Sequence, residues 1–233
     1  YRAGKTIDKL FVLEHCKEGS MNTVIREAKK HDTIINYVKK ERLDQMSETG
    51  KHQGVIAYAA AYDYASVDDI LEKAEQEGEA PFIIILDDIE DPHNLGAIIR
   101  TCEAAGFDNI IIPKNRSVSI NGTVVKTSVG TIERVKIAQV TNLNNAIQTL
   151  KKKGYWIIGT DMIGTDYKEL DYNGKVAIVI GNEGAGISRL VKENCDFIAT
   201  IPMNGQVNSL NASVAAGVLL FEILRQRRWF FEL

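Results

Sequence analysis

From residue 82 onward, short continuous apolar runs alternate with segments whose apolar residues recur every three or four positions. The runs predict strands buried on both faces, and the longer period predicts amphipathic helices. Strands are expected over 82–86, 110–112, 155–159, 176–180 and 197–201, with a further short strand inside 131–140. Helices are expected over about 91–105, 142–152 and 209–228. Strands that alternate with helices form a parallel sheet covered on both faces, so the predicted class is α/β.

The first 80 residues show a smaller set of alternating elements. Strands are expected over 10–13, 33–38 and 54–59, and helical segments over 22–30 and 39–46. Ser66 is placed as the N-cap of a further helix, with Asp69 at the reciprocal position of a capping box. The charged stretch 76–81 interrupts the periodicity and ends in Ala-Pro, which favours a linker. We therefore expect a small α/β domain over 1–80 and a larger domain over 81–233.

The composition narrows the class of protein without changing the predicted fold. A hydrophobic fraction of 45% and a charged fraction of 25% over 233 residues fit a soluble globular protein. No apolar run reaches the length of a membrane span, and the opening Tyr-Arg-Ala-Gly-Lys is no signal peptide. It reads as a cut inside an element, so we expect the natural chain to begin earlier and the first domain to be incomplete.

The three cysteines, Cys16, Cys102 and Cys195, are far apart in the sequence. Their spacing excludes a disulfide framework and a paired-cysteine zinc site. Such cysteine usage indicates a reducing compartment. We therefore expect a cytoplasmic protein that needs no membrane and no metal.

The net charge of -3 does not by itself indicate nucleic-acid binding, but the charge is unevenly distributed. Residues 1–55 hold 11 Lys and Arg against 8 Asp and Glu, whereas residues 56–80 hold 1 against 7. The first segment is therefore mildly basic, and an acidic stretch follows it.

A polar stretch from Asp87 to Arg100 follows the first strand of the larger domain and opens a helix. Its carboxylates could bind a metal, but a Mg²⁺ site needs converging ligands, and the simpler interpretation is that Asp91 caps the helix. Arg100 follows two apolar residues expected to face the core, so its side chain must reach solvent or bind an anion. A phosphate suits its planar guanidinium, and a structural salt bridge is the equal alternative. The four histidines are scattered and form no catalytic arrangement with Ser or Asp.

Two loops with small side chains follow strands near the C-terminus. The first, Gly181 to Ser188, reads Gly-Asn-Glu-Gly-Ala-Gly-Ile-Ser, and the second, Ile201 to Asn211, reads Ile-Pro-Met-Asn-Gly-Gln-Val-Asn-Ser-Leu-Asn. Glycine lets the backbone approach a ligand closely, so the two loops predict one shared pocket. The first loop lacks the lysine of a P-loop and the Gly-x-Gly-x-x-Gly spacing. Its Glu183 argues against a bound phosphate and is compatible with a neutral or cationic ligand.

The last helix is expected to begin at Ser209, with this residue as its N-cap. Small residues follow in Val-Ala-Ala-Gly, and they allow close helix packing, including packing against a second subunit. The helix ends in Arg-Gln-Arg-Arg, where basic side chains complement the helix dipole, and contact with RNA is the other interpretation.

Together, these motifs resemble the signature motifs of the SpoU (TrmH-type) RNA ribose 2'-O-methyltransferases, which belong to the SPOUT superfamily. The resemblance covers residues 82 to about 228, and Ala212 departs from it, because a valine is usual at that position. Residues 1–80 resemble the L30e-like substrate-binding domain of the subgroup acting on large-subunit ribosomal RNA. The residues that carry the resemblance are Asn94, Arg100, 181–186, 201–203 and 209–216.

The resemblance implies a fold, a cofactor and a reaction. The larger domain is expected to be an α/β domain with a deep trefoil knot, and the protein is expected to be an obligate homodimer. The implied cofactor is S-adenosylmethionine. The implied substrate is a ribose 2'-hydroxyl in structured RNA, which in this subgroup belongs to a guanosine of large-subunit ribosomal RNA.

The resemblance also assigns site residues. The catalytic positions are Asn94, Arg100, Glu183, Ser209 and Asn211. The cofactor is expected to be bound, mainly through backbone groups, by Thr160, Gly181, Asn182, Gly184, Ile201, Met203, Ser209 and Leu210. RNA phosphates are expected to contact Arg100 and the basic residues of the first domain, Lys29, Lys30, Lys39, Lys40 and Arg42.

No histidine stands where a general base is needed, so two roles for Arg100 stay open. It either grips an RNA phosphate and stabilises the developing alkoxide, or it acts as the base itself, as is proposed in the family. The electrostatic role is favoured because the unperturbed pKa of arginine lies above about 12. Asn94 would hold the ribose or Arg100, and Glu183 would order the loops and orient either of them. Ser209 and Asn211 would shape the catalytic pocket.

Other functions are compatible with parts of the sequence. A Rossmann-type nucleotide-binding enzyme would need the Gly-x-Gly-x-x-Gly spacing, which is missing. A transfer-RNA methyltransferase, or a ribosomal-RNA methyltransferase that confers antibiotic resistance, would share the same motifs. A non-catalytic RNA-binding protein that kept the fold is disfavoured by the intact Asn94, Arg100 and Glu183.

Overall fold

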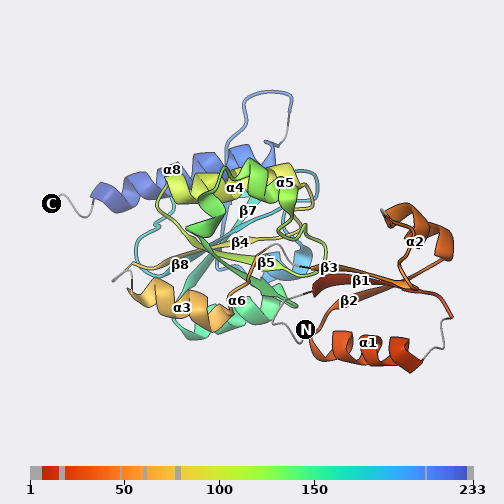
Figure 1. Cartoon of the computed structure of the whole chain (residues 1–233). Coiled ribbons are helices and arrows are strands. Elements are labelled where there is room, and N and C mark those ends of the chain that lie inside the picture. Colours follow the sequence, from red (N-terminus) through yellow and green to blue (C-terminus); the bar gives the residue numbers. More distant parts are fainter. Residues whose placement is uncertain are drawn as a thin grey trace. The chain divides into compact units, whose positions relative to one another are not determined.

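Two separate sheets organise the chain (Figure 1). The computed structural model describes residues 7–15, 19–47, 49–59, 62–76, 80–207 and 209–229. The chain divides into an N-terminal unit, residues 1–63, and a C-terminal unit, residues 64–233. Each unit has its own sheet and its own hydrophobic core, as two domains should have.

The N-terminal unit is built on a three-stranded sheet of order β2-β1-β3. Strand β1 runs parallel to β2 and antiparallel to β3. Helix α1 packs on one face, where its Met21 and Ala28 meet Leu10 and Val12 of β1. The elements are β1 (Ile7–Leu13), α1 (Gly19–Lys30), β2 (Ile34–Val38), α2 (Lys40–Met46) and β3 (Val55–Ala59).

The C-terminal unit is built on a six-stranded, fully parallel sheet of order β6-β5-β4-β8-β7-β9. Every residue of the central strands β4, β5 and β8 is buried, which explains why β4, β8 and the middle of β5 are continuous apolar runs in the sequence. The predicted α/β class is confirmed. The strands are β4 (Phe82–Leu86), β5 (Asn109–Pro113), β6 (Lys136–Val140), β7 (Trp156–Asp166), β8 (Val176–Ile180) and β9 (Phe197–Thr200).

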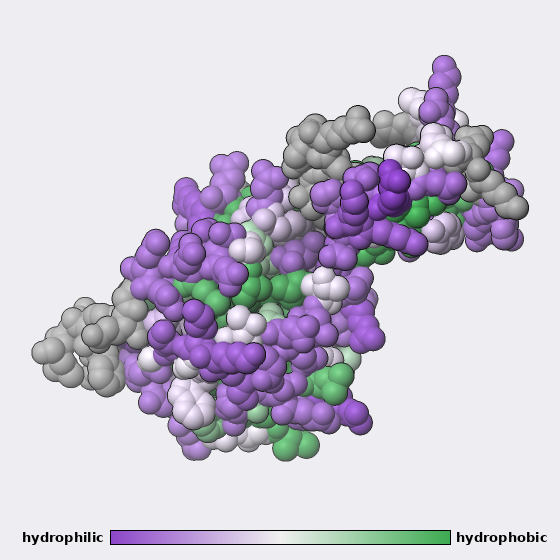
Figure 2. All heavy atoms as spheres, turned by 90° about the horizontal axis from the view of Figure 1, so that it is seen from below, coloured by the Kyte–Doolittle hydropathy of each residue, from purple (hydrophilic) through white to green (hydrophobic). Residues whose placement is uncertain are grey.

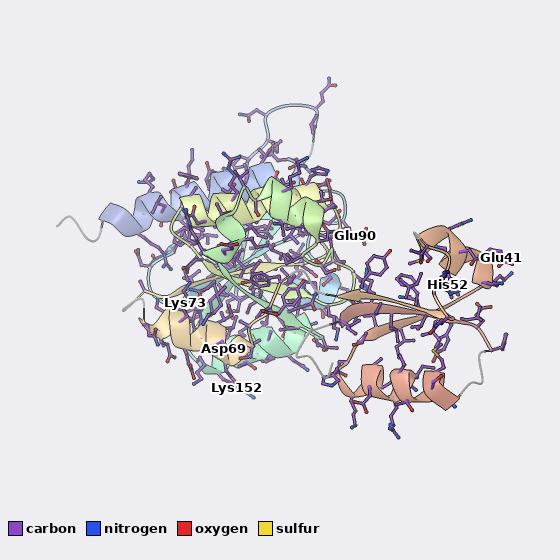
Figure 3. The ribbon with its side chains drawn as sticks, viewed as in Figure 1. Glu41, His52, Asp69, Lys73, Glu90 and Lys152 are labelled. Atoms are coloured by element: carbon purple, nitrogen blue, oxygen red, sulfur yellow. The ribbon has the colours of Figure 1, made fainter. Side chains whose placement is uncertain are left out.

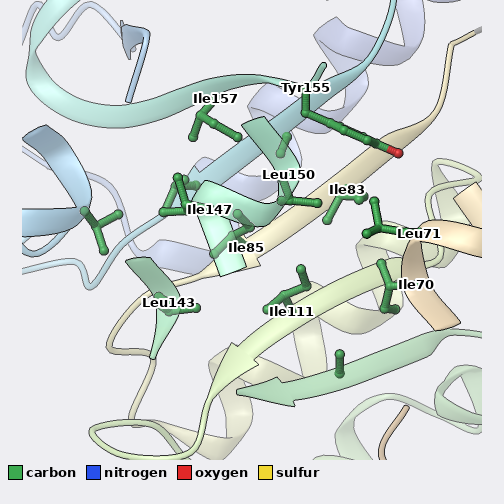
Figure 4. Close-up of a cluster of buried hydrophobic side chains, with 14 of the residues drawn as sticks. Ile70, Leu71, Ile83, Ile85, Ile111, Leu143, Ile147, Leu150, Tyr155 and Ile157 are labelled. Carbon is green, nitrogen blue, oxygen red and sulfur yellow. The ribbon is translucent and has the colours of Figure 1, made fainter. Parts of the chain in front are cut away.

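Helices cover both faces of this sheet (Figure 1). Helices α3 (Val67–Gln76) and α6 (Leu143–Lys152) cover one face, and their apolar side chains close the core cluster drawn in Figure 4. Helices α4 (Pro92–Ala104), α5 (Gly122–Thr127) and α8 (Ala212–Trp229) cover the other face. The outward side of the α3 and α6 layer is largely hydrophilic (Figure 2), as amphipathic helices require.

Helix α3 belongs to the C-terminal unit, which corrects the expected domain boundary. Its Ile70, Leu71 and Ala74 are buried in the core cluster under β4 and β5. Its Lys73, labelled in Figure 3, forms an ion pair with Asp108. The boundary therefore lies after residue 63, and not after residue 80, because the apolar face of α3 is needed to cover this sheet.

The capping box predicted at the start of α3 is confirmed. The Asp69 N–H donates to Ser66 Oγ at 3.0 Å, and the Ser66 N–H donates to Asp69 Oδ2 at 2.8 Å. The bonds that the Ser66 N–H and the Ser66 hydroxyl donate to Asp69 Oδ2 lower the pKa of Asp69. Each residue thus satisfies a backbone donor of the other, and the helix begins where the pair lies.

The start of α8 differs from the expectation. The helix begins at Ala212, and Ser209 does not cap it. The cap is Asn211, whose Oδ1 accepts the Ser213 N–H at 3.0 Å and whose carbonyl accepts the Ala215 N–H at 2.9 Å. An asparagine caps at least as well as a serine, so the later residue takes the role.

Three short elements were not anticipated, and one strand is longer than expected. The short elements are α5, the 3-10 turn η1 (Thr131–Glu133) and α7 (Arg189–Glu193). Strand β7 continues to Asp166, and its residues 165 and 166 pair with β9 after an irregularity. Asp161 and Met162 lie in this extension, after the buried residues of the strand.

The far end of α8 is anchored by a buried cation. The Arg227 guanidinium donates to the carbonyls of Tyr172, Gly174 and Ala80, and it stacks 4.8 Å from the ring centre of Phe82. Because these carbonyls satisfy its donors, the charge is tolerated inside the fold.

Cys102 is buried and Cys195 is half-buried, and both carry free thiols, whereas Cys16 lies outside the described residues. Within the part of the chain that the structure describes, none of the helices has the length and apolar character of a membrane span.

Candidate active site

A pocket of about 230 Å³ opens at the carboxyl ends of β8 and β9 and beside the middle of β7. Parallel strands bring their carboxyl ends to one edge of the sheet, so the loops that follow them meet there. The two loops singled out in the sequence form its walls. The pocket is lined by Thr160, Asp161, Met162, Ile180, Gly181, Asn182, Glu183, Gly184, Ala185, Gly186, Ala199, Ile201, Met203, Ser209, Leu210, Ala212, Ala215 and Leu219.

The loop after β8 is held in shape by its own asparagine. Asn182 Oδ1 accepts the N–H groups of Gly184 at 2.8 Å and Ala185 at 3.2 Å, and its Nδ2 donates to the Asp88 carbonyl at 3.2 Å. Gly181 has no room for a side chain, because a Cβ there would lie 2.3 Å from the Gly186 carbonyl carbon. The side chain of Asn182 is therefore engaged in forming the loop.

A buried carboxylate fixes the other end of this loop. Asp87, at the end of β4, is 3% exposed, and its Oδ2 accepts the Ser188 N–H at 2.7 Å. The next residue, Asp88, has a φ of 57°. Burial, and then the charge of Asp87, raises the pKa of Asp88. The acidic stretch after β4 thus serves the geometry of the glycine loop.

Three of the predicted catalytic side chains form one hydrogen-bonded network. Asn94 of α4 is buried, its Nδ2 donates to Glu183 Oε2 at 2.9 Å, and its Oδ1 accepts Asn211 Nδ2 at 3.0 Å. Glu183 Oε2 also accepts the Ala212 N–H at 3.3 Å. The network ties α4, the glycine loop and the start of α8 together, and Ser209 lies beside it in the pocket wall.

Arg100 lies apart from this network. Its side chain is exposed on α4, and it makes no hydrogen bond or ion pair with any residue that the structure describes. The salt bridge weighed from the sequence is therefore not present among those residues. Asp91 does cap α4, because its Oδ1 accepts the His93 N–H at 2.9 Å. The Arg100 guanidinium is left free to bind an external anion.

The basic residues predicted to contact RNA lie in the N-terminal unit, and all five are exposed. They belong to the end of α1 and the start of α2. One of them forms an ion pair within α1, because Lys30 Nζ lies 3.5 Å from Glu27 Oε1. These residues are Lys29, Lys30, Lys39, Lys40 and Arg42.

The chemistry of the pocket suits a cationic, partly apolar ligand. Among the described residues that line it, none is Lys, Arg or His, while Asp161 and Glu183 carry carboxylates. Such a lining fits a sulfonium and an adenine ring, and it does not fit a pyrophosphate. No group of three or more His, Cys, Asp or Glu side chains is placed to hold a metal within the described ranges.

All eight residues predicted to bind the cofactor line this one pocket. Their contact with the cofactor stays a prediction. Sequence reasoning missed Asp161 and Met162 from the extension of β7, and Ala215 and Leu219 from α8. The spacing of Ala212, Ala215 and Leu219 places them on one helix face, a signal that was present in the sequence.

The comparisons with known proteins agree with this geometry. The SpoU rRNA Methylase family model matches residues 81–221, and the model described as RNA 2'-O ribose methyltransferase substrate binding matches residues 1–65. A Bacillus subtilis protein, YacO, assigned to the TrmH family of tRNA/rRNA methyltransferases, is 48% identical over 227 residues. The match covers 97% of this chain and 91% of that protein.

Solved structures of the same family are also similar. An S-adenosylmethionine-bound rRNA methyltransferase from Sinorhizobium meliloti has a TM-score of 0.64 at 26% identity, over 96% of this chain and 82% of that chain. A TrmH/SpoU tRNA modifying enzyme from A. aeolicus has a TM-score of 0.60 at 30% identity, over 70% of this chain and 85% of that chain. The chain therefore belongs to the SpoU rRNA methylase (TrmH) family and is an S-adenosylmethionine-dependent RNA methyltransferase.

Proposed function

We propose that this protein methylates the 2'-hydroxyl of a ribose in structured RNA, and that the nucleotide is a guanosine of large-subunit ribosomal RNA. The observation that carries the proposal is the network joining Asn94, Glu183 and Asn211 beside the cofactor pocket. The N-terminal match to a ribose methyltransferase substrate-binding family supports the choice of a ribose oxygen.

The reaction is a displacement in which the ribose 2'-oxygen attacks a methyl group in line with its leaving sulfur: the O–C bond forms as the C–S bond breaks, a neutral thioether leaves, and the hydroxyl proton passes to solvent. S-adenosylmethionine, when bound, supplies the methyl group. Positioning should supply most of the rate, because the reacting atoms need only be held close and aligned. Asn94 keeps one N–H and a lone pair beyond its bonds to Glu183 and Asn211, and these can orient the ribose.

Arg100 is proposed to bind the phosphate beside the target ribose and to stabilise the developing alkoxide. Its exposed and unpaired guanidinium supports this role, since no internal carboxylate among the described residues competes for it. The alternative, in which Arg100 accepts the 2'-hydroxyl proton, requires a neutral guanidine. An exposed guanidinium does not provide the unusual environment that this would need. Ser209 and Asn211 are proposed to shape the pocket.

The basic residues of α1 and α2 are proposed to hold the RNA through its phosphates. Their exposure supports this proposal. The folded target region would be recognised through its shape and backbone, which does not require a positive net charge.

We further propose that the protein is a homodimer. Val214 and Phe221 of α8 are 52% and 51% exposed, and their separation of seven residues places them on one helix face. Met203 and Val207, in the loop before α8, are exposed as well. An exposed apolar surface of this kind is typical of an interface. A cytoplasmic location and a knotted last third are proposals that rest on the family.

Transfer RNA and the ribosomal RNA sites targeted by antibiotic-resistance methyltransferases are the alternative substrates. The decisive experiment is methylation of total RNA with labelled S-adenosylmethionine, followed by mapping of the modified nucleotide. A 2'-O-methylguanosine in large-subunit ribosomal RNA is expected. Label in transfer RNA, or on a base, would contradict the proposal. A protein that binds RNA without transferring label would be the non-catalytic alternative.

A further inference from the structure

A carboxylate outside all three sequence motifs forms part of the cofactor pocket. Asp161 follows Thr160 on β7, and it lies opposite the glycine loop. Its Oδ2 is 4.0 Å from the position that a Cβ on Gly186 would take. The side chain is 20% exposed, and its place in the pocket lining means that a ligand held between the two walls would meet it.

The orientation of this carboxylate is fixed by two donors. Lys192 Nζ of α7 donates to Asp161 Oδ2 at 2.7 Å, and the Met162 N–H donates to Oδ1 at 2.7 Å. Each oxygen has a further lone pair that can accept a bond. Burial acts to raise the pKa of Asp161, but the bonds from Lys192 and Met162 outweigh it and lower the pKa. The group is therefore a fixed, ionised acceptor.

The other carboxylate of the pocket is already used by the protein. Glu183 accepts bonds from Asn94 and from the Ala212 N–H, and these tie together the loops. Asp161 makes no such link between loops, and each of its oxygens keeps a lone pair on the pocket wall opposite the glycine loop.

The cofactor offers two kinds of donor that suit a carboxylate, the hydroxyls of its ribose and the ammonium of its methionine part. Lys192 already balances the charge of Asp161 from 2.7 Å away. A second ammonium at the same carboxylate would be repelled by Lys192, whereas neutral hydroxyls would not be. We propose that Asp161, held in place by Lys192, accepts hydrogen bonds from the ribose diol of S-adenosylmethionine and helps to select this cofactor.

The test is a set of binding titrations without RNA, so its outcome does not depend on the RNA substrate proposed above. Wild type and Asp161→Asn are titrated calorimetrically with three ligands. They are S-adenosylmethionine, 5'-methylthioadenosine, which lacks the amino-acid part, and the 2',3'-dideoxy form of 5'-methylthioadenosine, which also lacks the diol.

Asp161→Asn is expected to raise the Kd of the first two ligands about tenfold, because charge-assisted hydrogen bonds are lost. It should leave the Kd of the dideoxy ligand unchanged, because that ligand cannot make the bonds. An equal loss for the dideoxy ligand would show that the substitution deforms the pocket, and it would overturn the proposal. A loss confined to S-adenosylmethionine would assign Asp161 to the ammonium, and unchanged affinity for all three ligands would remove any role for it.

Asp166→Asn is the matched control. Asp166 lies on the same strand, but it is not among the pocket residues, and its Oδ1 accepts the Lys168 N–H at 3.0 Å. The same substitution there should change no Kd. A similar loss at Asp166 would attribute the effect to the strand as a whole and would overturn the assignment.

Discussion

Asn94 of α4 donates a hydrogen bond to Glu183 of the glycine loop at 2.9 Å, although 89 residues separate the two in the sequence. Asn94 is buried, and the same carboxylate oxygen of Glu183 receives the first N–H of α8. One carboxylate therefore holds three segments in a common arrangement. Because buried polar groups are costly when unpaired, this arrangement is also specific.

Replacing Glu183 with Gln should disturb this arrangement with little change in charge elsewhere. Glutamine keeps one oxygen that can accept both bonds, but this oxygen is neutral, so the bonds from Asn94 and the Ala212 N–H would weaken and Asn94 would shift. We expect methyl transfer to slow by roughly a hundredfold, because small misplacements of a reacting group have effects of that order. The measurement is single-turnover methylation of RNA. Glu193→Gln, on exposed α7, is the control and should keep wild-type rates.

Arg100→Ala should abolish methylation and leave the affinity for S-adenosylmethionine and the Tm unchanged. The side chain is exposed and makes no bond within the described residues, so its loss should not affect folding. Methylation assays, calorimetry and thermal melts measure the three quantities. The control is Arg134→Ala. Arg134 is also exposed, but it pairs with Glu103 of α4, and its loss should leave the activity unchanged. Activity within a few fold of wild type in Arg100→Ala would rule out the proposed role.

Gly181→Ala should destabilise the protein and weaken cofactor binding. The new Cβ would lie 2.3 Å from the backbone of Gly186, and a backbone atom cannot move aside cheaply. We expect a loss of about 1–3 kcal/mol in the free energy of unfolding, as for overpacked sites. Urea unfolding gives this value. Gly184→Ala is the control in the same loop, where the nearest atom is 3.4 Å from the new Cβ, and it should have a much smaller effect.

Phe221→Glu should convert the proposed dimer to a monomer. A charge on the exposed apolar face of α8 would have to be buried unpaired in the interface, which is strongly unfavourable. Sedimentation equilibrium measures the change in mass. Trp156→Glu replaces another exposed aromatic residue, 56% exposed at the start of β7, and should leave the dimer intact. Equal masses for wild type and Phe221→Glu would remove α8 from the interface.

Glu222 should stabilise the protein in a pH-dependent way. The hydrogen bond from Arg225 lowers the pKa of Glu222 to about 2, and a bond from Gln226 acts in the same direction. Burial acts to raise this pKa but is outweighed. A lowered pKa stabilises the fold above the unfolded value of about 4.3, and this stabilisation is lost as the pH falls toward 2. Relative to Glu222→Gln, wild type should gain about 1 kcal/mol above pH 5, as expected for a screened pair. Denaturant unfolding from pH 2 to 7 would show the difference, and a constant difference would contradict it.

The central strands of the larger sheet could be predicted because burial on both faces leaves only apolar residues in them, as in Ile83, Ile84 and Ile85 of β4. The short elements could not be predicted in this way. Helix α7 has five residues, too few for a helical period to be visible. The domain boundary was misplaced because the charged stretch after α3 resembles a linker, although the apolar face of α3 packs on the larger sheet.

The candidate pocket could be predicted because both of its loops follow parallel strands of one sheet, β8 and β9, which are separated by β7 alone. Its network could be predicted only in part. The contact between Glu183 and Asn94 was one of two alternatives, and the structure shows this one and leaves Arg100 without a partner among the described residues. Asp161 was missed because β7 was expected to end before it.

The position of the unit boundary has a practical consequence for engineering. Tyr64 accepts a hydrogen bond from the Ile120 N–H, and Ala65 pairs with Ala138 of β6. The C-terminal unit is therefore packed together from residue 64 onward. A chimaera that exchanges the N-terminal unit should therefore be joined after residue 63. A join after residue 80 would also remove α3, whose apolar face covers the core of the C-terminal unit.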